Sequence, residues 1–565
     1  MSVLVPALQS MGNESVGPIF YLTARGTTRT AAENALAILR DTEPELHLRS
    51  VTLTAKDKIC LCETRECTPE ACPYANGYYA RIKGALWDVL DVPCLTAETL
   101  QEYAERHTVC PFELGLDSSL WSDVIIGDYN YLFDPVVHLV RFFESAGDYI
   151  FLVDEAHNLP GRAREMHSAA LTKTSFYEAK KLLGKGKSSL KNALTKVNDV
   201  FIEWRHRAEE ETAARDGRFG KTFFLKERSE EFDHLLNRLC EPLEAWLDDH
   251  REPDETHTAL LQLYFDVRAW LRVADTFDDH FVLQITASGS EVRAAQLCLD
   301  PSAFLADSFA LGRAAVLFSA TLAPASYYKD LCGVPEARAV ALRSPFPAGN
   351  QGLFCIGNVS TRYKDRDASL AIVEESLATM VRARCGNYLA FFPSYAYMEQ
   401  AYAQFKEHCP EINCIKQENA MDEQQKAAFL AQFVPGPSQT LLGFAVMGGV
   451  FGEGVDLTGD RLIGVGIVGP GLPQVGPRQE QLRDYFEQTR GSGFDYAYRY
   501  PGMNKVLQAA GRVIRTPRDK GVVLLIDNRF AMPDYRRLMP PHWSHLKMIY
   551  DTEELERELW RFWEE

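Results

Sequence analysis

Short apolar runs recur along this chain and alternate with stretches in which apolar positions follow the helical period. Runs rich in β-branched and aromatic residues, bounded by polar positions, are typical of buried strands. Their alternation with helical stretches predicts parallel α/β layers. The predicted strands cover residues 19–22, 124–126, 149–153, 315–318, 388–392, 462–468 and 522–526.

Two segments interrupt this alternation. Residues 175–278 are rich in Lys and Glu and carry leucines at helical spacing with hardly any strand-like run, which predicts an all-helical insertion. Residues 56–115 form a second insertion, rich in Cys, Tyr and Pro. The alternation of strands and helices covers residues 1–55, 116–174 and 279–324, around these insertions, and residues 325–565 after them.

Composition and charge narrow the class of protein. At 565 residues the chain is too long for one core, and its 46% hydrophobic and 24% charged content is ordinary for a globular protein. No apolar run of 18 residues and no signal peptide occur, so we expect a cytoplasmic protein without a membrane segment. The net charge of −18 argues against a broad basic face that coats nucleic acid. It does not exclude a narrow groove that grips one strand.

A pair of carboxylates follows the predicted strand 149–153. Asp154 and Glu155 would lie at the carboxyl end of a parallel strand, where α/β sheets place catalytic groups. The first can hold Mg²⁺, and the second can orient or deprotonate an attacking water. The alternative is an acidic loop at a strand end.

Two later motifs suit a phosphate ligand. Residues 452–456, Gly-Glu-Gly-Val-Asp, form a glycine-rich loop in which the backbone can approach a ligand closely. Arg512 and Arg515 are three residues apart, which predicts one face of a helix. Paired guanidiniums can bind phosphate oxygens, although the arginines taken alone fit a solvated helix face better.

Six of the 13 cysteines lie between Cys60 and Cys110. A cytosolic chain keeps its thiols reduced, so structural disulfides do not explain them. The spacing C-x6-C-x4-C-x37-C of Cys60, Cys67, Cys72 and Cys110 lacks the tight C-x2-C pairs usual at zinc sites. It suits a cubane that needs one thiolate per iron, while zinc and unligated core thiols remain alternatives. Cys62 could compete with Cys60 or Cys67 as a ligand.

The order of motifs resembles the superfamily-two helicases. Residues 154–157 read DEAH, 319–322 read SATL, 452–456 read GEGVD and 508–515 read QAAGRVIR. The second of these motifs, extended to residue 324 as SATLAP, and the last motif are similar to those of the XPD/DinG branch in particular. The resemblance implies an α/β fold of two RecA-like parallel-sheet motor domains. It further implies an Fe–S cluster insertion at 56–115 and an Arch-like insertion at 175–278, both in the first motor domain.

This resemblance also implies roles for the motif residues. Asp154 would hold Mg²⁺, Glu155 would be the catalytic base, and Arg512 and Arg515 would act as arginine fingers on ATP. The other residues expected to bind nucleotide in the cleft between the motor domains are Gln508, Gly454 and Asp456.

Cluster and DNA ligands follow from the same resemblance. XPD-like helicases carry a [4Fe–4S] cluster in this insertion, which implies Cys60, Cys67, Cys72 and Cys110 as ligands. Hydroxyls, arginines and exposed aromatic rings suit a DNA strand, although core packing is the alternative for the two tyrosines. The expected DNA contacts are Thr23, Arg25, Tyr129, Tyr131 and Ser394.

A motor of this kind needs a G-x4-G-K-[ST] loop after the first strand of its first domain. The strings that end at Ser188 and Thr222 lack the required first glycine, with Lys181 and Arg215 in its place. Residues 1–12 resemble the helix that follows the loop, so we expect this chain to begin just after it, through a late coding start or a truncation.

The function implied is that of a monomeric, ATP-dependent 5′→3′ DNA helicase that binds single-stranded DNA and DNA junctions, in repair or replication-associated processing. Because the loop is missing, the alternative is a catalytically inactive helicase-fold protein that binds DNA. An iron–sulfur redox sensor or oxidoreductase is a weaker alternative, since the sequence contains no dinucleotide fingerprint.

Overall fold

A computed structural model describes residues 2–13, 16–24, 26–43, 45–184, 188–214, 220–252, 254–451 and 457–564. The chain divides into two units, each with its own core. Unit 1 is Met1–Ser319 with Tyr328–Glu336, and unit 2 is Ala320–Tyr327 with Ala337–Glu565. The division therefore falls within residues 319–337, around the boundary expected at 324. No helix of the described residues is both long and apolar enough to cross a bilayer.

Unit 1 is built on a six-stranded parallel sheet in the order β10-β5-β1-β4-β2-β3. The pairing aligns the strand ends, since Thr23 pairs with Asp128 and Phe318 with Asp154. These four residues therefore lie along one edge of the sheet. The strands are β1 Ile19–Thr23, β2 Ser50–Thr52, β3 Cys94–Leu95, β4 Val124–Asp128, β5 Ile150–Asp154 and β10 Ala314–Phe318.

Strand β10 differs from its neighbours in burial. Strands β1, β2, β4 and β5 are buried along almost their whole length, as expected for a parallel sheet covered on both faces. Ala314, Ala315 and Val316 of β10 are exposed, and β10 is the edge strand. The sheet therefore has one open, apolar edge.

The cysteine-rich segment is helical but not separate from this sheet. Strand β3 lies inside the insertion predicted at 56–115, yet it pairs in parallel with β2. The helices of unit 1 before β5 are α1 Leu4–Asn13, α2 Gly26–Thr42, α3 Lys56–Ile59, α4 Tyr78–Val89, α5 Ala97–His107, α6 Pro111–Ser118, α7 Asn130–Phe133 and α8 Val140–Phe143.

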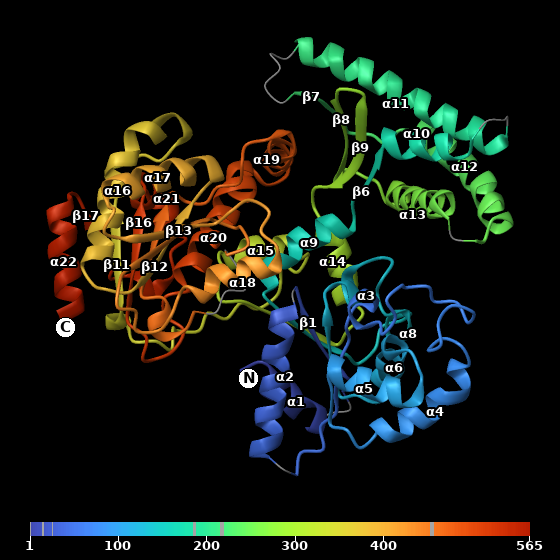
Figure 1. Ribbon diagram of the computed structural model, residues 1–565, viewed down its shortest axis with the longest axis horizontal. Coiled ribbons are helices and arrows are strands. Elements are labelled where there is room, and N and C mark those ends of the chain that lie inside the picture. Colours follow the sequence, from blue (N-terminus) through green and yellow to red (C-terminus); the bar gives the residue numbers. More distant parts are fainter. Residues whose placement is uncertain are drawn as a thin grey trace. The chain divides into compact units, whose positions relative to one another are not determined.

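The insertion predicted to be all-helical contains a strand, so that prediction is wrong. Strand β7 lies within it and is part of a four-stranded antiparallel sheet in the order β6-β9-β8-β7 (Figure 1). Phe223 of β7 is fully buried, and the partner of β7 lies more than 50 residues further along the chain. These elements are α9 Leu159–Met166, β6 Ala169–Thr172, α10 Lys173–Leu182, α11 Ser189–Ala214, β7 Lys221–Leu225, α12 Glu230–Asp249, α13 Glu255–Asp275, β8 Phe281–Ser288, β9 Glu291–Cys298 and α14 Ser302–Phe309.

Unit 2 is built on a seven-stranded parallel sheet in the order β13-β14-β12-β15-β16-β11-β17. Each strand pair is parallel. Figure 1 shows this sheet together with its helices. The strands are β11 Gln351–Ile356, β12 Asn387–Phe392, β13 Asn413–Lys416, β14 Leu441–Val446, β15 Gly464–Val468, β16 Gly521–Ile526 and β17 Lys547–Ile549.

Two apolar layers cover the faces of this second sheet. Along β12, Tyr388 and Phe392 pack with α16, α17 and α22, whereas Leu389 and Phe391 pack with α18, α20 and α21. Alternation with a period of two sends successive side chains to opposite faces, so both faces are buried. The helices of unit 2 are α16 Arg366–Arg382, α17 Tyr395–His408, α18 Glu423–Ala431, α19 Pro477–Arg490, α20 Tyr500–Ala510, α21 Pro533–Arg536 and α22 Thr552–Glu564, and α15 Ala325–Leu331 spans the division of the chain into units.

Candidate functional site

The carboxylate pair lies where the sequence predicts it, at the carboxyl end of β5. Asp154 is the last residue of the strand and is held from three sides. Tyr21 Oη donates to Asp154 Oδ2 at 2.8 Å, and the backbone N–H of Glu155 donates to Oδ1 at 2.8 Å. Tyr129 Oη donates to the backbone carbonyl of Asp154. The carboxylate is therefore fixed in orientation at the edge of the sheet.

Burial sets the electrostatics of Asp154. Desolvation raises the pKa of this carboxyl, the hydrogen bond from Tyr21 opposes the rise, and the charge of Glu155 adds to it. No lysine or arginine of the described chain forms an ion pair with Asp154. A divalent cation would supply the missing positive charge, because Mg²⁺ binds through one or two carboxylates and keeps several waters.

Glu155 adopts a backbone conformation that non-glycine residues rarely use, with φ of +49°. Its side chain is 41% exposed, and Ser319 Oγ donates to Glu155 Oε2 at 3.1 Å. His157 Nδ1 lies 2.8 Å from Ser319 Oγ and 3.3 Å from Glu155 Oε2. The ends of β5 and β10 are thereby linked, and an oriented carboxylate faces solvent.

Sequence reasoning missed three residues of this arrangement. Tyr21, His157 and Ser319 all contact one of the two carboxylates, although no role was predicted for any of the three and the last two were named only as members of the DEAH and SATL motifs. For His157 and Ser319 the signal was present in the sequence, since both follow strands whose parallel carboxyl ends meet at one edge, whereas Tyr21 lies in the middle of β1.

The tyrosines expected to stack on DNA lie in the core of unit 1. Tyr129 has no exposed surface and Tyr131 is 6% exposed. Gly127 leaves room for the Tyr131 ring, which a Cβ at Gly127 would approach to 2.7 Å. A ring without an open face cannot stack on a base, so the burial corrects the DNA-stacking role and favours the core-packing alternative.

The other residues that the sequence predicts to contact DNA are Thr23, Ser394 and Arg25. The Thr23 side chain is fully buried at the end of β1. Ser394 caps α17 by accepting a hydrogen bond from the backbone N–H of Tyr397, and it also accepts one from Arg366 Nη1 at 3.2 Å. Arg25 lies outside the described residues.

The arginines of unit 2 lie beyond a helix rather than on its face, which corrects the prediction. Helix α20 ends at Ala510, so Gln508 is helical while Arg512 and Arg515 are in the following turn. Gly511 and the β-branched Val513 and Ile514 disfavour continuation of the helix. Arg512 is 5% exposed, whereas Arg515 is exposed.

Asp519 organises this arginine turn. Its carboxylate accepts hydrogen bonds from the backbone N–H groups of Arg515 and Thr516, both at 2.7 Å, and from Thr516 Oγ1 at 2.7 Å. Burial alone would raise the pKa of Asp519, but these hydrogen bonds outweigh it and lower the pKa. These hydrogen bonds therefore fix the conformation of the turn and of the Arg515 backbone. Gly454 and Asp456 lie outside the described residues.

The thiols of the cysteine segment form two groups, one of Cys60, Cys62 and Cys72 and the other of Cys67 and Cys110 beside Lys56. Cys62 Sγ lies 3.9 Å from Cys72 Sγ, and burial together with Cys72 and Cys60 raises the pKa of Cys62 to about 11. Cys67 and Cys110 act together on the ammonium of Lys56. Clustered thiolates repel one another, and iron would offset that charge.

The side-chain positions do not form a finished metal site. Among the described residues there is no group of three or more His, Cys, Asp or Glu side chains arranged to hold a metal ion. Cys72 is buried and Cys67 is exposed, so the two sets of thiols differ in environment. The donor chemistry suits iron, and Cys62 joins Cys60 and Cys72 as a candidate ligand.

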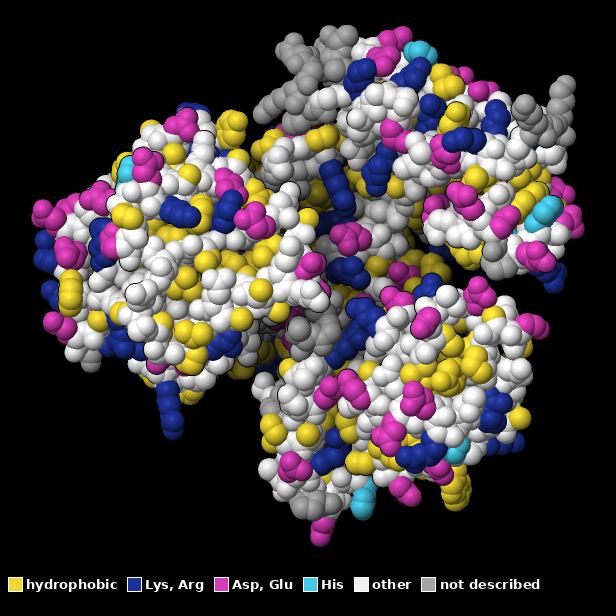
Figure 2. All heavy atoms as spheres, in the orientation of Figure 1, with side chains coloured by type: hydrophobic (Ala, Val, Ile, Leu, Met, Phe, Trp, Pro, Cys, Tyr) yellow, Lys and Arg dark blue, Asp and Glu magenta, His cyan; other side chains and the backbone are white. Residues whose placement is uncertain are grey.

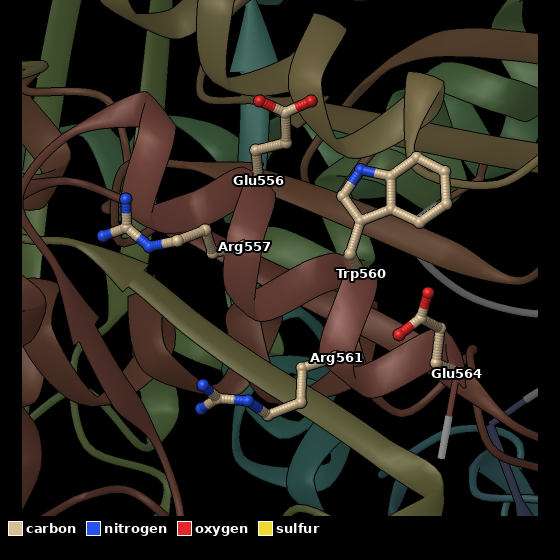
Figure 3. A pocket seen from close by; sticks show the side chains of 5 residues that line it. All are labelled: Glu556, Arg557, Trp560, Arg561 and Glu564. Carbon is tan, nitrogen blue, oxygen red and sulfur yellow. The ribbon is translucent and has the colours of Figure 1, made fainter.

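Neither the charge pattern of the visible face nor the hollow along α22 indicates a second catalytic site. On the visible face, basic side chains are interspersed with acidic ones over each part rather than gathered in one broad field (Figure 2). A hollow of about 630 Å³ runs along α22 (Figure 3). All its lining residues belong to that one helix, so it offers no converging catalytic groups. They are Glu556, Arg557, Trp560, Arg561 and Glu564.

Each of the two units contains residues that match a known protein family. Residues 43–176 match the family described as DEAD_2, and residues 377–546 match the family described as Helicase C-terminal domain. The solved structures similar to this chain include one titled XPD_Helicase, with a TM-score of 0.61 and 17% identity over 95% of this chain and 92% of that one. Another is titled Structure of S. tokodaii Xpd4, with a TM-score of 0.55 and 14% identity over 97% and 98%. These likenesses confirm the predicted fold of two RecA-like parallel-sheet domains.

Similar sequences carry helicase names. The chain is 25% identical to the general transcription and DNA repair factor IIH helicase subunit XPD of Schizosaccharomyces pombe, over 79% of this chain and 67% of that protein. It is 22% identical to the ATP-dependent DNA helicase CHL1 of Coccidioides immitis, over 80% and 60%. It is also 22% identical to the regulator of telomere elongation helicase 1 of Rattus norvegicus, over 88% and 45%. The chain thus spans between about half and two thirds of the length of these relatives.

Proposed function

We propose that this chain, which belongs to the XPD/DinG type of superfamily-two helicases, forms the motor of an ATP-dependent DNA helicase. The motor would move 5′→3′ along single-stranded DNA and unwind duplexes and junctions during repair or replication-associated processing. The observation that carries the proposal is the pair Asp154 and Glu155 at the end of β5, bound through Ser319 to the end of β10. A half-buried carboxylate beside an exposed, oriented one suits phosphoryl transfer to water.

Unit 1 would supply the metal ligand and the base. Asp154 would bind Mg²⁺ directly or through water, which supports the proposal because its buried charge has no cationic partner among the described residues. Glu155 would orient and deprotonate the attacking water, with Ser319 and His157 fixing the carboxylate. The Mg²⁺ ion supplies positive charge to the phosphate oxygens of ATP.

Unit 2 would supply positive charge to the transferred phosphate. Arg512 and Arg515 would act as arginine fingers, and Gln508 would contact the nucleotide. The turn fixed by Asp519 supports this role, because an arginine that stabilises a transition state must be positioned before the reaction. Gly454 and Asp456 would bind the same nucleotide.

The DNA-binding and cluster proposals concern other residues. Arg25 and Ser394 would lie along the DNA strand, with the protein acting as a monomer, whereas the fully buried Thr23 side chain would not contact it. Four of the five thiols of Cys60, Cys62, Cys67, Cys72 and Cys110 would hold a [4Fe–4S] cluster in residues 56–115, and the approach of Cys62 Sγ to within 3.9 Å of Cys72 Sγ supports this proposal.

Phosphate release with and without single-stranded DNA tests the proposed function. Residues 1–565 contain no G-x4-G-K-[ST] string, so the assay compares this chain with one extended before Met1 by a segment that supplies it. We expect negligible turnover by the 565-residue chain and DNA-stimulated turnover by the extended chain. In the extended chain Glu155→Gln should abolish turnover and spare nucleotide binding. Arg512→Ala should lower turnover by a factor on the order of 10³.

The control is Glu556→Gln, which changes an exposed carboxylate on α22 and should leave turnover unchanged. DNA binding without turnover in either form would favour the inactive DNA-binding protein instead. Robust turnover by the 565-residue chain that disappears in Glu155→Gln would place the phosphate-binding loop elsewhere in the sequence.

A further inference from the structure

A short segment joins β11 to α16 at the carboxyl edge of the unit 2 sheet, and its base is firmly anchored. The backbone N–H and Oγ1 of Thr361 donate to Asp527 Oδ2 at 3.0 and 2.5 Å. Asp527 follows β16 and also accepts hydrogen bonds from Arg529 Nε and Nη2 at 2.7 and 2.8 Å. Ligands of parallel α/β sheets bind at this edge.

Arg366, the first residue of α16, has an unusual environment above this anchor. Its guanidinium lies between two aromatic rings, 5.3 Å from the Tyr363 centroid and 5.1 Å from the Tyr397 centroid. Nη1 donates to Ser394 Oγ at 3.2 Å, and Nε is buried without a hydrogen-bond partner. No carboxylate of the described chain forms an ion pair with Arg366.

This arrangement leaves most of the binding capacity of the arginine unused. A guanidinium has five N–H donors. One on Nη1 is used by Ser394 and the one on Nε is buried, which leaves the remaining donors of Nη1 and Nη2 to a ligand. Burial lowers the pKa of Arg366, which reflects a cation held partly out of water without a counter-ion. A phosphate oxygen would satisfy both the charge and the free donors.

Tyr363 supplies a second kind of contact beside this cation. Its side chain is 86% exposed, so one face of the ring is open while the other side meets Arg366. Lys364 is also exposed, and Arg362 is held by Ser360 and Asn528 at 3.2 and 3.1 Å. An open ring beside several cations suits a nucleic acid strand better than an apolar protein surface.

We propose that Tyr363 and Arg366 bind single-stranded DNA, the Tyr363 ring stacking on a base and the Arg366 guanidinium holding a neighbouring phosphate. Ser394 is then a positioning residue that acts through Arg366 rather than a direct phosphate contact. This inference rests on the proposed DNA-binding function. It replaces the buried tyrosines of unit 1 with an exposed ring in unit 2 as the stacking residue.

Fluorescence anisotropy of the full chain with two labelled oligonucleotides, oligo-dT and a matched abasic strand, tests the proposal. Tyr363→Ala should weaken oligo-dT binding about tenfold and leave abasic binding unchanged, because only bases stack. Arg366→Ala should weaken both strands and reduce the salt dependence by about one phosphate contact. Tyr550→Ala and Arg557→Ala, at an exposed tyrosine and an exposed arginine of unit 2, should bind both strands like wild type.

The role of Ser394 is measured by a double-mutant cycle. Ser394→Ala alone should weaken both strands about threefold, and it should add no further loss in the Arg366→Ala background. An effect of the missing helix cap alone would be independent of residue 366 and would add in full, which would overturn the positioning role.

The remaining outcomes separate this inference from the proposed function. If wild type binds oligo-dT while Tyr363→Ala and Arg366→Ala bind like the two controls, the inference fails and the proposed function stands. An equal loss on both strands for Tyr363→Ala means that the ring is structural and overturns stacking. If wild type binds neither strand, the proposed function itself fails.

Discussion

At the residue scale, the two adjacent carboxylates after β5 have opposite environments. Asp154 is half-buried among hydrogen-bond donors, whereas the Glu155 side chain is 41% exposed. Burial favours the neutral form of Asp154 and a cation would favour the charged form. Asp154 is thus suited to binding an ion and Glu155 to transferring a proton. The difference between the two carboxylates comes from their tertiary environments and not from their residue types.

A stability measurement tests the environment of Asp154. Because its pKa is raised in the folded state, the folded protein binds this proton more tightly, and stability falls as the pH rises through that pKa. Asp154→Asn removes the ionised group, so thermal unfolding at pH 7 should show a gain on the order of 1 kcal/mol. The gain should shrink as the pH falls toward the ordinary range of an aspartate.

Asp148→Asn is the control for that measurement, since Asp148 is 66% exposed in the same unit and should show little change at either pH. A loss of stability in Asp154→Asn at pH 7 would mean that the hydrogen bonds from Tyr21 and Glu155 outweigh the cost of the buried charge.

At the element scale, the cysteine segment combines a motor-sheet strand with a cluster of thiols. Strand β3 ties the segment to β2, while Cys60, Cys62 and Cys72 interact with one another in the loops before α4. Short helices and loops of this kind have little core of their own. A metal that links several loops would therefore contribute directly to the folding of the segment.

Iron analysis of protein purified without oxygen tests this view. We expect about four irons per chain, as a cubane requires, and loss of the iron and of protease resistance in the segment for Cys72→Ser. Cys94→Ser is the matched control, because Cys94 lies in β3 and should retain the iron. Comparison of Cys62→Ser with Cys67→Ser then identifies the fourth ligand. Stoichiometric zinc without iron would contradict the cluster.

At the scale of the whole molecule, each of the two units has its own apolar clusters, so we expect the two units to differ in their stability toward unfolding. Asp527 is fully buried and pairs with Arg529, whose side chain is 13% exposed, so it stabilises unit 2 specifically. Burial would raise the pKa of Asp527, but the bonds from Arg529 and Thr361 outweigh this and lower the pKa. The stability that it contributes is present above the ordinary aspartate pKa and is lost as the pH falls through its lowered pKa.

Calorimetry should therefore resolve two transitions, since multidomain proteins seldom unfold in one step. Asp527→Asn should lower the free energy of unfolding in one of the two transitions by about 3–5 kcal/mol, because it leaves the Arg529 charge buried without its partner. The other transition should be unchanged. Glu556→Gln, on the exposed face of α22, should shift neither. An equal shift of both transitions would show that the units unfold together.

Much of the fold follows from the sequence alone. All seven predicted strands are present, because a buried strand in a parallel sheet leaves a local apolar run. Asp154 and Glu155 lie where the run before them ends, and the order of the motifs identified the family. These features depend on residues that are close together in the chain, so local patterns record them.

The tertiary structure decided which way particular side chains face and what they meet. The tyrosine-rich motif suggested stacking, but packing buried Tyr129 and Tyr131 and left Tyr363 open to solvent. The local pattern predicted helix where strand β7 lies, because the strand that pairs with β7 is distant in sequence. The end of α20 is different, since the helical spacing of Arg512 and Arg515 was misleading although Gly511, Val513 and Ile514 disfavour a helix locally. Burial and strand pairing are set by contacts between distant residues, which a local pattern does not contain.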